Sequence, residues 1–314
     1  MSLSQEQVSR LLALVGMPED MQSRCDDLTY LRRLMRLFVQ AVPFGSLALH
    51  YSPGRFISLN LDDLFEKIVE NGHGGYCMEL NSLFAALLRA LGFLTVTIGG
   101  RIAKGQGQFS GPTHMAMIVT IKDERYLVDV GFGPSTAFLP IPMVKTSDVD
   151  SFPVIGTRRG KLEFTSLDLH TDPSQRAWVY STQHNSESEW TQQYAVTEQE
   201  LAQPDYEVMN HFTSTHPTAF FVQNLLMVKV ICSSSEGDDF EPKQIVTLFR
   251  DRLRFSTPGV GDPKIAVLAS EEERVSAIKE QFGITLTRRE RESIEGHASA
   301  IASEKSTDAI ISRP

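Results

Sequence analysis

The sequence predicts an α+β fold, with helices first and antiparallel strands after them. Two observations lead to this prediction. Apolar residues recur at helical spacing over residues 1–95, whereas short β-branched segments separated by turn residues follow from Phe93 onward. The chain of 314 residues is long enough for two or three domains, each with its own core.

The first 95 residues show the spacing of amphipathic helices. Between Leu28 and Val42, apolar side chains occupy one face and three arginines another. Candidate helices cover Leu3–Val15, Leu28–Val42, Leu61–Glu70 and the segment from Cys77 to Leu91. Proline and glycine residues mark their ends. We expect Phe44–His50 to be an apolar connector between the second and third helices.

From Leu94 the pattern changes to short strands, which is typical of a small antiparallel barrel or sandwich. The candidate strands are Leu94–Ile98, Met115–Ile121, Tyr126–Val130, Leu162–Leu169, Trp178–Tyr180, Gln192–Ala195, Leu226–Ile231, Lys243–Phe249 and Arg252–Phe255. We expect a glycine-rich loop over Gly99–Gly111 and a short helix at Glu198–Ala202. Glu271–Phe282 predicts a helix with an acidic first turn, and Arg288–Pro314 an extension.

Composition excludes some classes of function. The net charge of −9 argues against a nucleic-acid-binding surface, because phosphate contacts require clustered Lys and Arg. The cysteines Cys25, Cys77 and Cys232 form no CxxC pair, so we expect neither a disulfide scaffold nor a metal site. Without a visible signal segment or an apolar run near the ~20 residues that cross a membrane, the sequence predicts a cytoplasmic protein with no membrane partner.

Cys77 lies where a glycine-rich segment meets an apolar helix. Gly74, Gly75 and Tyr76 precede it, and a strongly apolar run follows. A thiol at a helix N-terminus feels the positive end of the helix dipole, which favours the reactive thiolate. The position therefore suits a nucleophile, although a small buried structural cysteine fits this stretch too.

Two further residues fit a nucleophilic cysteine. His114 opens a predicted strand after Gly111-Pro112, and Asp129 lies among apolar residues before Gly131. Each has an ordinary structural interpretation on its own. Together they fit the chemistry, because a thiol needs an imidazole to take its proton and the imidazole needs a carboxylate to orient it.

The predicted hairpin does not bring these two residues together without adjustment. A two-residue turn at Asp123-Glu124 would place Asp129 opposite Ile118, four residues from His114 along the strand. That separation is ~13 Å, which is too far for a hydrogen bond. A triad therefore requires a different register, a bulge, or a histidine reaching from the strand end.

With these residues in place, the chain resembles the arylamine N-acetyltransferases. The family's Arg-Gly-Gly-Tyr-Cys-x-Glu-x-Asn signature appears as His73–Asn81, and its Val-Asp-x-Gly-Phe-Gly motif as Val128–Gly133. The strand of its catalytic histidine matches Thr113–Met115. Its Pro-Phe-Glu-Asn-Leu motif is partly present as Pro43–Leu47, and its Ser/Thr-x-Pro-x-x-x-Phe segment lies within Asn210–Phe220. These anchors follow the family order over roughly residues 5–285.

The resemblance implies an architecture and a set of site residues. The implied domains are a helical domain (1–95), a β-barrel domain (96–205), an α/β lid (206–290) and an extension (291–314), built on a cysteine-protease-like catalytic core. The implied site residues are Cys77, His114 and Asp129 as the catalytic triad, Ser110, Gly111, Phe212 and Thr218 for coenzyme A, and Phe44 and Phe132 for the acceptor, with no metal.

The resemblance also implies ping-pong chemistry. Cys77 would take an acetyl group from acetyl-CoA and pass it to an arylamine, arylhydrazine or N-hydroxyarylamine, in a monomer or homodimer that detoxifies foreign compounds. Some fungal members prefer malonyl-CoA, so that donor is an alternative. A transglutaminase-like Cys-His-Asp amide hydrolase and a catalytically silent binding protein are further alternatives. Two departures bear on packing near the site: His73 replaces the signature arginine, and Gly45-Ser46 replaces Glu-Asn.

Overall fold

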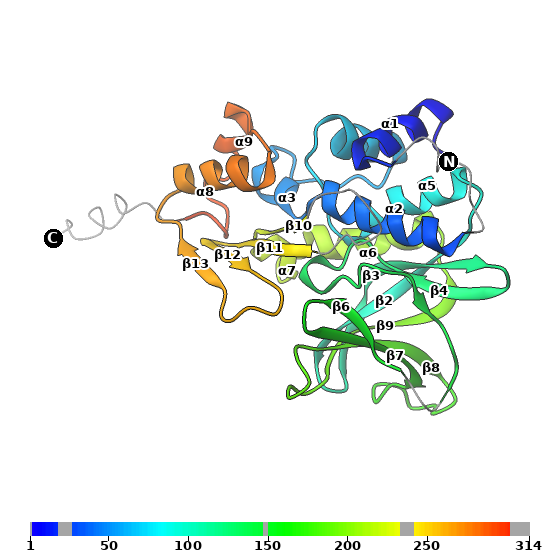
Figure 1. The fold of residues 1–314 in the computed structure, drawn as a ribbon. Helices are drawn as coiled ribbons and strands as arrows, with labels where there is room; N and C mark the ends of the chain where they lie inside the picture. The colour runs from blue at the N-terminus through cyan, green and yellow to red at the C-terminus, as the bar shows by residue number, and fades with distance from the viewer. Residues whose placement is uncertain (1, 18–26, 147–149, 233–241, 302–314) are drawn as a thin grey trace.

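The computed structural model describes residues 2–17, 27–146, 150–232 and 242–301 (Figure 1). Cys25 and residues 302–314 of the expected extension lie outside these ranges. The helices are α1 (Gln5–Val15), α2 (Leu28–Ala41), α3 (Leu47–Tyr51), α4 (Leu61–Phe65), α5 (Cys77–Ala90), α6 (Gln203–Thr215), α7 (Phe220–Gln223), α8 (Glu271–Ala277) and α9 (Arg288–Glu292). The π-helical turns η2 (Glu66–Glu70) and η4 (Ile278–Phe282) continue α4 and α8, and η3 (Gly133–Ser135) is a short 3₁₀ turn.

The strands form two antiparallel sheets. The first has the order β1-β10-β11-β12-β13 and the second β5-β4-β3-β2-β9-β8-β7-β6. Strands of the first sheet are β1 (Phe44–Gly45), β10 (Leu226–Cys232), β11 (Pro242–Phe249), β12 (Arg252–Ser256) and β13 (Lys264–Val267). Strands of the second are β2 (Leu94–Gly105), β3 (Gln108–Ile121), β4 (Glu124–Val128), β5 (Ile141–Pro142), β6 (Phe152–Ile155), β7 (Arg158–Ser166), β8 (Arg176–Gln183) and β9 (Thr191–Glu200).

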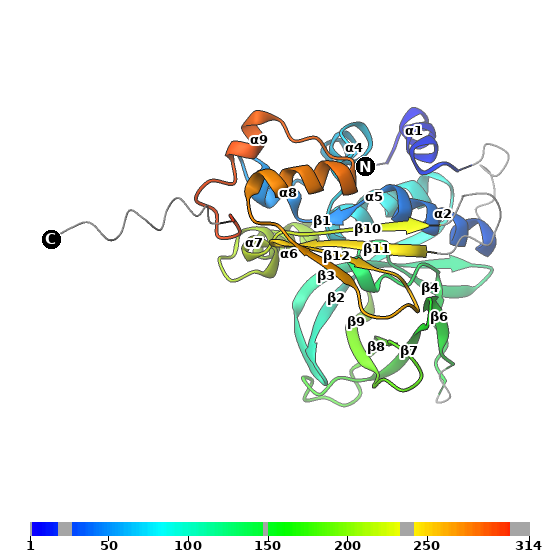
Figure 2. The ribbon, with the colours of Figure 1, turned by 60° about the vertical axis from the view of Figure 1, so that its left-hand side comes forward.

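The fold is α+β, as the sequence predicts. Figure 2 shows helices on one side of β10–β12 and the curled eight-stranded sheet on the other. No helix in the described ranges is long and apolar enough to cross a membrane. The division into four domains stays a prediction, and β1 pairs with β10, so a segment from the helical part joins the sheet of the C-terminal part.

Strand β3 separates two hydrophobic cores. Met115, Met117 and Val119 pack in the core under the helices, whereas Ala116 and Ile118 pack inside the curled sheet. This two-residue alternation follows from strand geometry, since successive side chains point to opposite faces. β3 is therefore held rigidly on both sides, which suits a strand that carries a site residue.

Three sequence expectations about local structure were wrong. Gly99–Gly111 is not a loop, because β2 runs to Gly105 and β3 begins at Gln108. A Cβ at Gly99 would lie 2.6 Å from Leu201, and one at Gly100 3.2 Å from His114, so these glycines permit close packing within a strand.

The helix expected at Glu198–Ala202 is also absent from that segment. β9 continues to Glu200, and α6 begins three residues later, at Gln203. Glu198 accepts hydrogen bonds from Trp178 on the neighbouring β8 and from Arg125 on β4, which is not adjacent to β9, so partners within the same sheet hold this acidic residue. The expected connector Phe44–His50 likewise holds the short β1 and most of α3.

Candidate active site

Cys77 is the first residue of α5 and is buried, with 4% of its surface exposed. Glu79 caps the helix by accepting a hydrogen bond from the Tyr76 backbone N–H at 3.0 Å. The carboxylate also pairs with Lys67 at 2.5 Å, which fixes it in place. Gly74, at φ +64°, allows the chain to pass the carbonyl of Pro43, where any Cβ would clash at 2.1 Å. The glycines therefore bring a tight turn to the start of α5, and the thiol lies at the positive end of its dipole.

His114 lies inside β3 rather than at its start. β3 contains one extra residue between the pairs Gly100–His114 and Arg101–Pro112, which makes Thr113 a bulge. The carbonyl oxygen of Thr113 lies 3.9 Å from Cys77 Sγ, so the bulge borders the thiol. Bulges redirect neighbouring side chains, and this one adjoins His114.

The observed register brings Asp129 close to His114. The turn is Lys122-Asp123, both at positive φ, so Ile121 pairs with Glu124 and Met117 with Val128. The sequence predicts the turn one residue later, at Asp123-Glu124. When a hairpin turn moves by one residue, each residue of one strand faces a partner two residues away on the other strand. Continuing the observed register sets Asp129 opposite Ala116, two residues from His114. Asp129 Oδ2 lies 2.7 Å from His114 Nε2.

Asn81 holds the Asp129 carboxylate. It lies four residues after Cys77, on the same face of α5. Its Nδ2 donates to Asp129 Oδ1 at 2.9 Å and to the Met115 carbonyl at 2.7 Å, and its Oδ1 accepts from Val130 N at 3.0 Å. Gly131 N donates to Asp129 Oδ1 at 2.8 Å as well. One side chain thus joins the nucleophile's helix to β3 and to the segment after β4.

The electrostatics of the cluster favour a charged His114. Burial by itself lowers the pKa of His114, but the charge of Asp129 and hydrogen bonds to Asp129 and Cys77 outweigh it and raise the pKa from 6.5 to about 10. The imidazole is therefore protonated near neutral pH. Because Nε2 faces Asp129, the other ring nitrogen is the one left for Cys77.

A cavity of about 510 Å³ opens above Cys77 and His114. Its volume lies within the range of small-molecule sites. The resemblance implies six ligand-binding residues besides the catalytic triad. Five of the six line the wall of this cavity: Phe44, Ser110, Phe132, Phe212 and Thr218. Gly111 adjoins Ser110 without lining the cavity, and Asp129 lies behind His114.

The mouth of the cavity is aromatic and exposed. Phe212 has 47% of its surface exposed, and its ring stacks on His216 with centroids 4.8 Å apart. Thr218 Oγ1 lies 3.0 Å from His216 Nδ1. Ser110 Oγ accepts from Ile102 N at 2.9 Å and donates to the Gly111 carbonyl at 2.6 Å, so its hydroxyl is already engaged within the hairpin.

Several residues of the site have no assigned role in the sequence. Asn81 had a signal, its i+4 spacing from Cys77, but its partner could not be read from the sequence. Tyr194, whose ring lies 4.9 Å from that of His114, and Phe221, which lines the cavity, come from distant elements without any motif. Among the described residues that line the cavity, Lys104 is the one lysine, and no arginine, aspartate or glutamate lines it.

Cys232 is the other cysteine among the described residues, and it lies away from the cavity. Burial raises the pKa of the Cys232 thiol to about 12, so this half-buried residue is not a reactive thiol. Within the described ranges, no group of three His, Cys, Asp or Glu side chains is placed to hold a metal ion.

Comparisons with known proteins place the chain among related sequences and folds. A family model described as N-acetyltransferase matches residues 27–291. The chain is 32% identical over 299 residues to the N-malonyltransferase FDB2 of Gibberella moniliformis, covering 88% of this chain and 84% of that protein. It is 29% identical over 270 residues to arylamine N-acetyltransferase 2 of Mesocricetus auratus, covering 84% and 89%. The solved arylamine N-acetyltransferase from Mycobacterium abscessus has a TM-score of 0.78 at 25% identity, covering 92% and 93%.

Proposed function

The chain belongs to the arylamine N-acetyltransferase family, and from this premise we propose that it transfers an acyl group from acyl-CoA, through a thioester on Cys77, to an aromatic amine. The observation that carries this proposal is the position of Cys77 and His114 at the floor of a cavity with several aromatic residues, with Asp129 bonded to His114 behind it. The acceptors are arylamines, arylhydrazines or N-hydroxyarylamines, which are flat and neutral near pH 7. Aromatic walls suit such molecules, and their binding buries no charge.

The first half-reaction uses a thiolate–imidazolium pair. In this pair Cys77 has passed its proton to His114, and its thiolate, the nucleophilic form of cysteine, attacks the thioester carbonyl of the donor. The new bond joins Cys77 Sγ to the acyl carbon, and the bond from that carbon to the sulfur of coenzyme A breaks. His114 gives its proton to the departing thiolate, which leaves a neutral imidazole beside the acyl-enzyme.

The second half-reaction returns that proton. With Cys77 acylated, the contribution of its thiolate to the raised pKa of His114 is lost, so the pKa of His114 falls. The neutral imidazole then takes a proton from the amine as its nitrogen attacks the acyl carbon. The bond between that carbon and Sγ breaks, and the thiolate and imidazolium are restored. Asp129 keeps the ring oriented through both steps.

The residues at the mouth suit the donor's nucleotide. The exposed, stacked rings of Phe212 and His216 offer a flat surface for adenine, and Thr218 and the Ser110-Gly111 backbone lie nearby. For the acyl group, we take acetyl as the first candidate because Phe44, Phe132 and Gly131 near the thiol are apolar. Malonyl is the second candidate, because the FDB2 relative is named a malonyltransferase.

The test is the intact mass of the protein after incubation with acetyl-CoA or malonyl-CoA alone. One acyl adduct is expected on Cys77, and an arylamine should discharge it while forming one amide per adduct. The donor that acylates faster identifies the physiological acyl group. Water discharging the adduct as fast as the amine would instead favour a hydrolase.

A matched control separates Cys77 from the other thiols. The Cys25→Ala/Cys232→Ala double variant should keep the single adduct, and Cys77→Ala should lose it. If neither acyl-CoA modifies Cys77 in the wild type, the proposed chemistry is wrong.

A further inference from the structure

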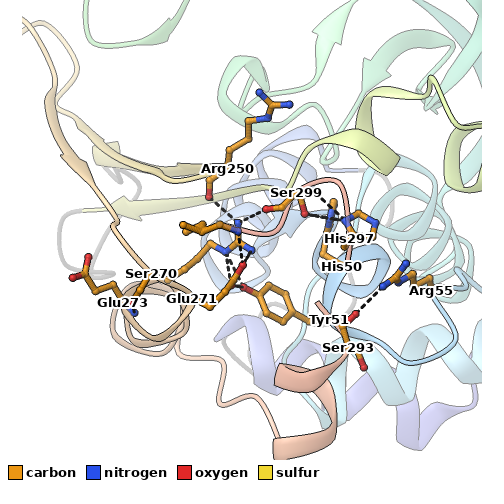
Figure 3. Close-up of polar contacts among 12 residues, drawn as sticks. His50, Tyr51, Arg55, Arg250, Ser270, Glu271, Glu273, Ser293, His297 and Ser299 are labelled. Atoms are coloured by element: carbon orange, nitrogen blue, oxygen red, sulfur yellow. Dashed lines mark hydrogen bonds and ion pairs between the residues drawn. The ribbon is translucent and has the colours of Figure 1, made fainter. Parts of the chain in front are cut away.

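The segment Ser293–Ile301, which we term the C-terminal strap, lies beyond the family match and is anchored at several points (Figure 3). Arg55 donates to the Ser293 carbonyl at 2.8 Å, and the fully buried Arg274 donates to the Ser299 carbonyl at 2.8 Å. Glu271, which pairs with Arg274, accepts from Ile301 N at 2.8 Å. The strap is therefore a built part of the fold.

The strap meets the rest of the molecule at His50, which is fully buried in α3. His50 Nδ1 lies 2.7 Å from Ser299 Oγ and 3.3 Å from His297 Nδ1. On the other side of the ring, Nε2 lies 2.9 Å from the backbone carbonyl of Phe221. One imidazole thus connects the strap to α7.

These contacts determine the tautomer of His50. A carbonyl only accepts, so Nε2 must carry the proton and donate it to Phe221. Nδ1 must then accept, and the donor in reach is the Ser299 hydroxyl, which lies nearer to His50 Nδ1 (2.7 Å) than to His297 Nδ1 (3.0 Å). His297 Nδ1 accepts from Ser299 N at 3.2 Å, so it has no proton to offer His50. Burial, followed by the neighbouring His297, lowers the pKa of His50 to about 3, which keeps the ring neutral and makes its tautomer matter.

Phe221 transmits this contact to the active-site cavity. It lines the cavity, and its ring meets those of Phe44 at 6.0 Å and Tyr76 at 5.6 Å, both edge-on. Tyr76 directly precedes Cys77. A shift of the Phe221 backbone would therefore move an aromatic wall beside the thiol.

Gly45 and Ser46, which replace Glu-Asn of the family motif, lie where His50 meets α7 and β10. Gly45 allows close approach of β10, because a Cβ there would lie 2.8 Å from the Leu226 carbonyl. Ser46 Oγ donates to the Asn224 carbonyl at 3.2 Å, accepts from Leu226 N at 3.2 Å, and lies 3.3 Å from His50 Nε2. Ser46, at the position of the Asn of the family motif, therefore contacts both His50 and the residue that follows α7.

From these contacts, and resting on the proposed function, we infer that Ser299 and His50 are positioning residues for acceptor choice. The Ser299 hydroxyl donates to His50 Nδ1 and so supports the Nε2–H tautomer that the Phe221 carbonyl requires. This hydrogen bond to the carbonyl holds Phe221, and with it the aromatic wall of the cavity, in place. Without the Ser299 hydroxyl, His50 Nδ1 and His297 Nδ1 face each other as two acceptors 3.3 Å apart. Their repulsion displaces the His50 ring and weakens its hydrogen bond to the Phe221 carbonyl.

The test compares Ser299→Ala with Ser293→Ala, which removes a hydroxyl of the same strap that bonds Arg289 rather than His50. In Ser299→Ala, the KM for a one-ring amine such as aniline should rise about 5-fold, as for one lost hydrogen bond. The KM for a two-ring aminonaphthalene should change less, and the acylation rate of Cys77 should stay the same. Ser299→Thr, which keeps the hydroxyl, should restore the KM for aniline.

A second readout does not depend on activity. The ¹⁵N shifts of the His50 ring should report Nε2–H in the wild type and in both variants. The Nδ1 shift should be that of a hydrogen-bonded acceptor in the wild type and Ser293→Ala, and of an unbonded nitrogen in Ser299→Ala. Amides 222–224 should exchange about 5-fold faster in Ser299→Ala only. An Nδ1–H wild type, or equal effects of both variants, would overturn the inference. Failure of Cys77 to accept an acyl group would remove the proposed function, and the tautomer and exchange data would still decide whether Ser299 positions Phe221.

Discussion

Asn81 shows how one side chain links residues that are far apart in the sequence. Its amide satisfies Asp129, Met115 and Val130 at once, in a fully buried position. β3 has no β4 partner at Met115, because β4 ends at Val128. Asn81 therefore takes the place of a missing ladder bond and orients the carboxylate with the same group.

We predict that Asn81→Ala lowers both activity and stability. The loss of its three hydrogen bonds leaves buried backbone groups unpaired and should cost roughly 2–4 kcal/mol of unfolding free energy. The acyl-transfer rate should fall about 10- to 100-fold, part of the ~10²–10⁴-fold that positioned proton transfer contributes. Urea denaturation and single-turnover transfer are the measurements.

Thr97→Val is the control, since it removes a buried hydrogen bond to the Leu201 carbonyl in the same sheet but away from Asp129. It should lower stability and spare the transfer rate. Equal transfer rates in Asn81→Ala and wild type would contradict an orienting role for Asn81.

At the scale of elements, the site depends on how closely α5 approaches the segment after β4. A Cβ on Gly131 would lie 2.8 Å from Cys77 Cα and 2.8 Å from Asn81 Nδ2. Gly131 is therefore needed for contact between the helix of the nucleophile and the segment of Asp129. Its φ is not in the left-handed region, so the requirement is one of space alone.

We predict that Gly131→Ala pushes the start of α5 away from Asp129. Overpacking of this kind typically costs ~1–3 kcal/mol, and a displacement of ~1 Å at a reacting group reduces rate by ~100-fold. The acylation rate of Cys77 and the melting temperature are the measurements. Gly54→Ala is the control, because a Cβ there meets nothing within 4 Å. Equal acylation rates of Cys77 in Gly131→Ala and Gly54→Ala would show that α5 accommodates a Cβ at position 131 without displacement.

At the scale of the whole molecule, two buried histidines have opposite pKa shifts. Burial and His297 lower the pKa of His50 to about 3, whereas Asp129 and Cys77 overcome burial and raise that of His114 to about 10. An unfolded histidine titrates at ~6.5, and below that pH the unfolded chain binds a proton that folded His50 refuses. Above it, the proton on folded His114 is, in the proposed pair, the one that Cys77 has given up, whereas an unfolded thiol keeps its proton up to ~8.5. The pair therefore holds one proton in both states near neutral pH and adds no pH dependence there.

The unfolding free energy should therefore decrease through His50 as pH falls below about 6.5. The slope from this one group is at most ~1.4 kcal/mol per pH unit, the value for one proton. Urea denaturation at about pH 5 and 6.5 measures it. His50→Gln should make the slope shallower by up to that amount, and an unchanged slope would argue against a neutral, buried His50.

Sequence alone determined the α+β class, most helices and strands, and three residues of complementary chemistry. Helical and strand periodicities are local, so the predicted helix Leu28–Val42 matches α2 within one residue, and the predicted strand Met115–Ile121 covers the second half of β3. Cys77, His114 and Asp129 were recognisable because a thiol, an imidazole and a buried acid have a joint chemical purpose.

Only the tertiary structure decided how those residues meet. The hairpin turn lies at Lys122-Asp123, one residue earlier than expected. This shifts the partner of Asp129 on β3 by two residues, because moving a turn by one residue moves every antiparallel pair by two. The partners of Asn81 and the contact between Ser299, His50 and Phe221 join segments that are 34 to 249 residues apart. Such contacts depend on the packing of segments far apart in the sequence, and local sequence patterns carry no information about it.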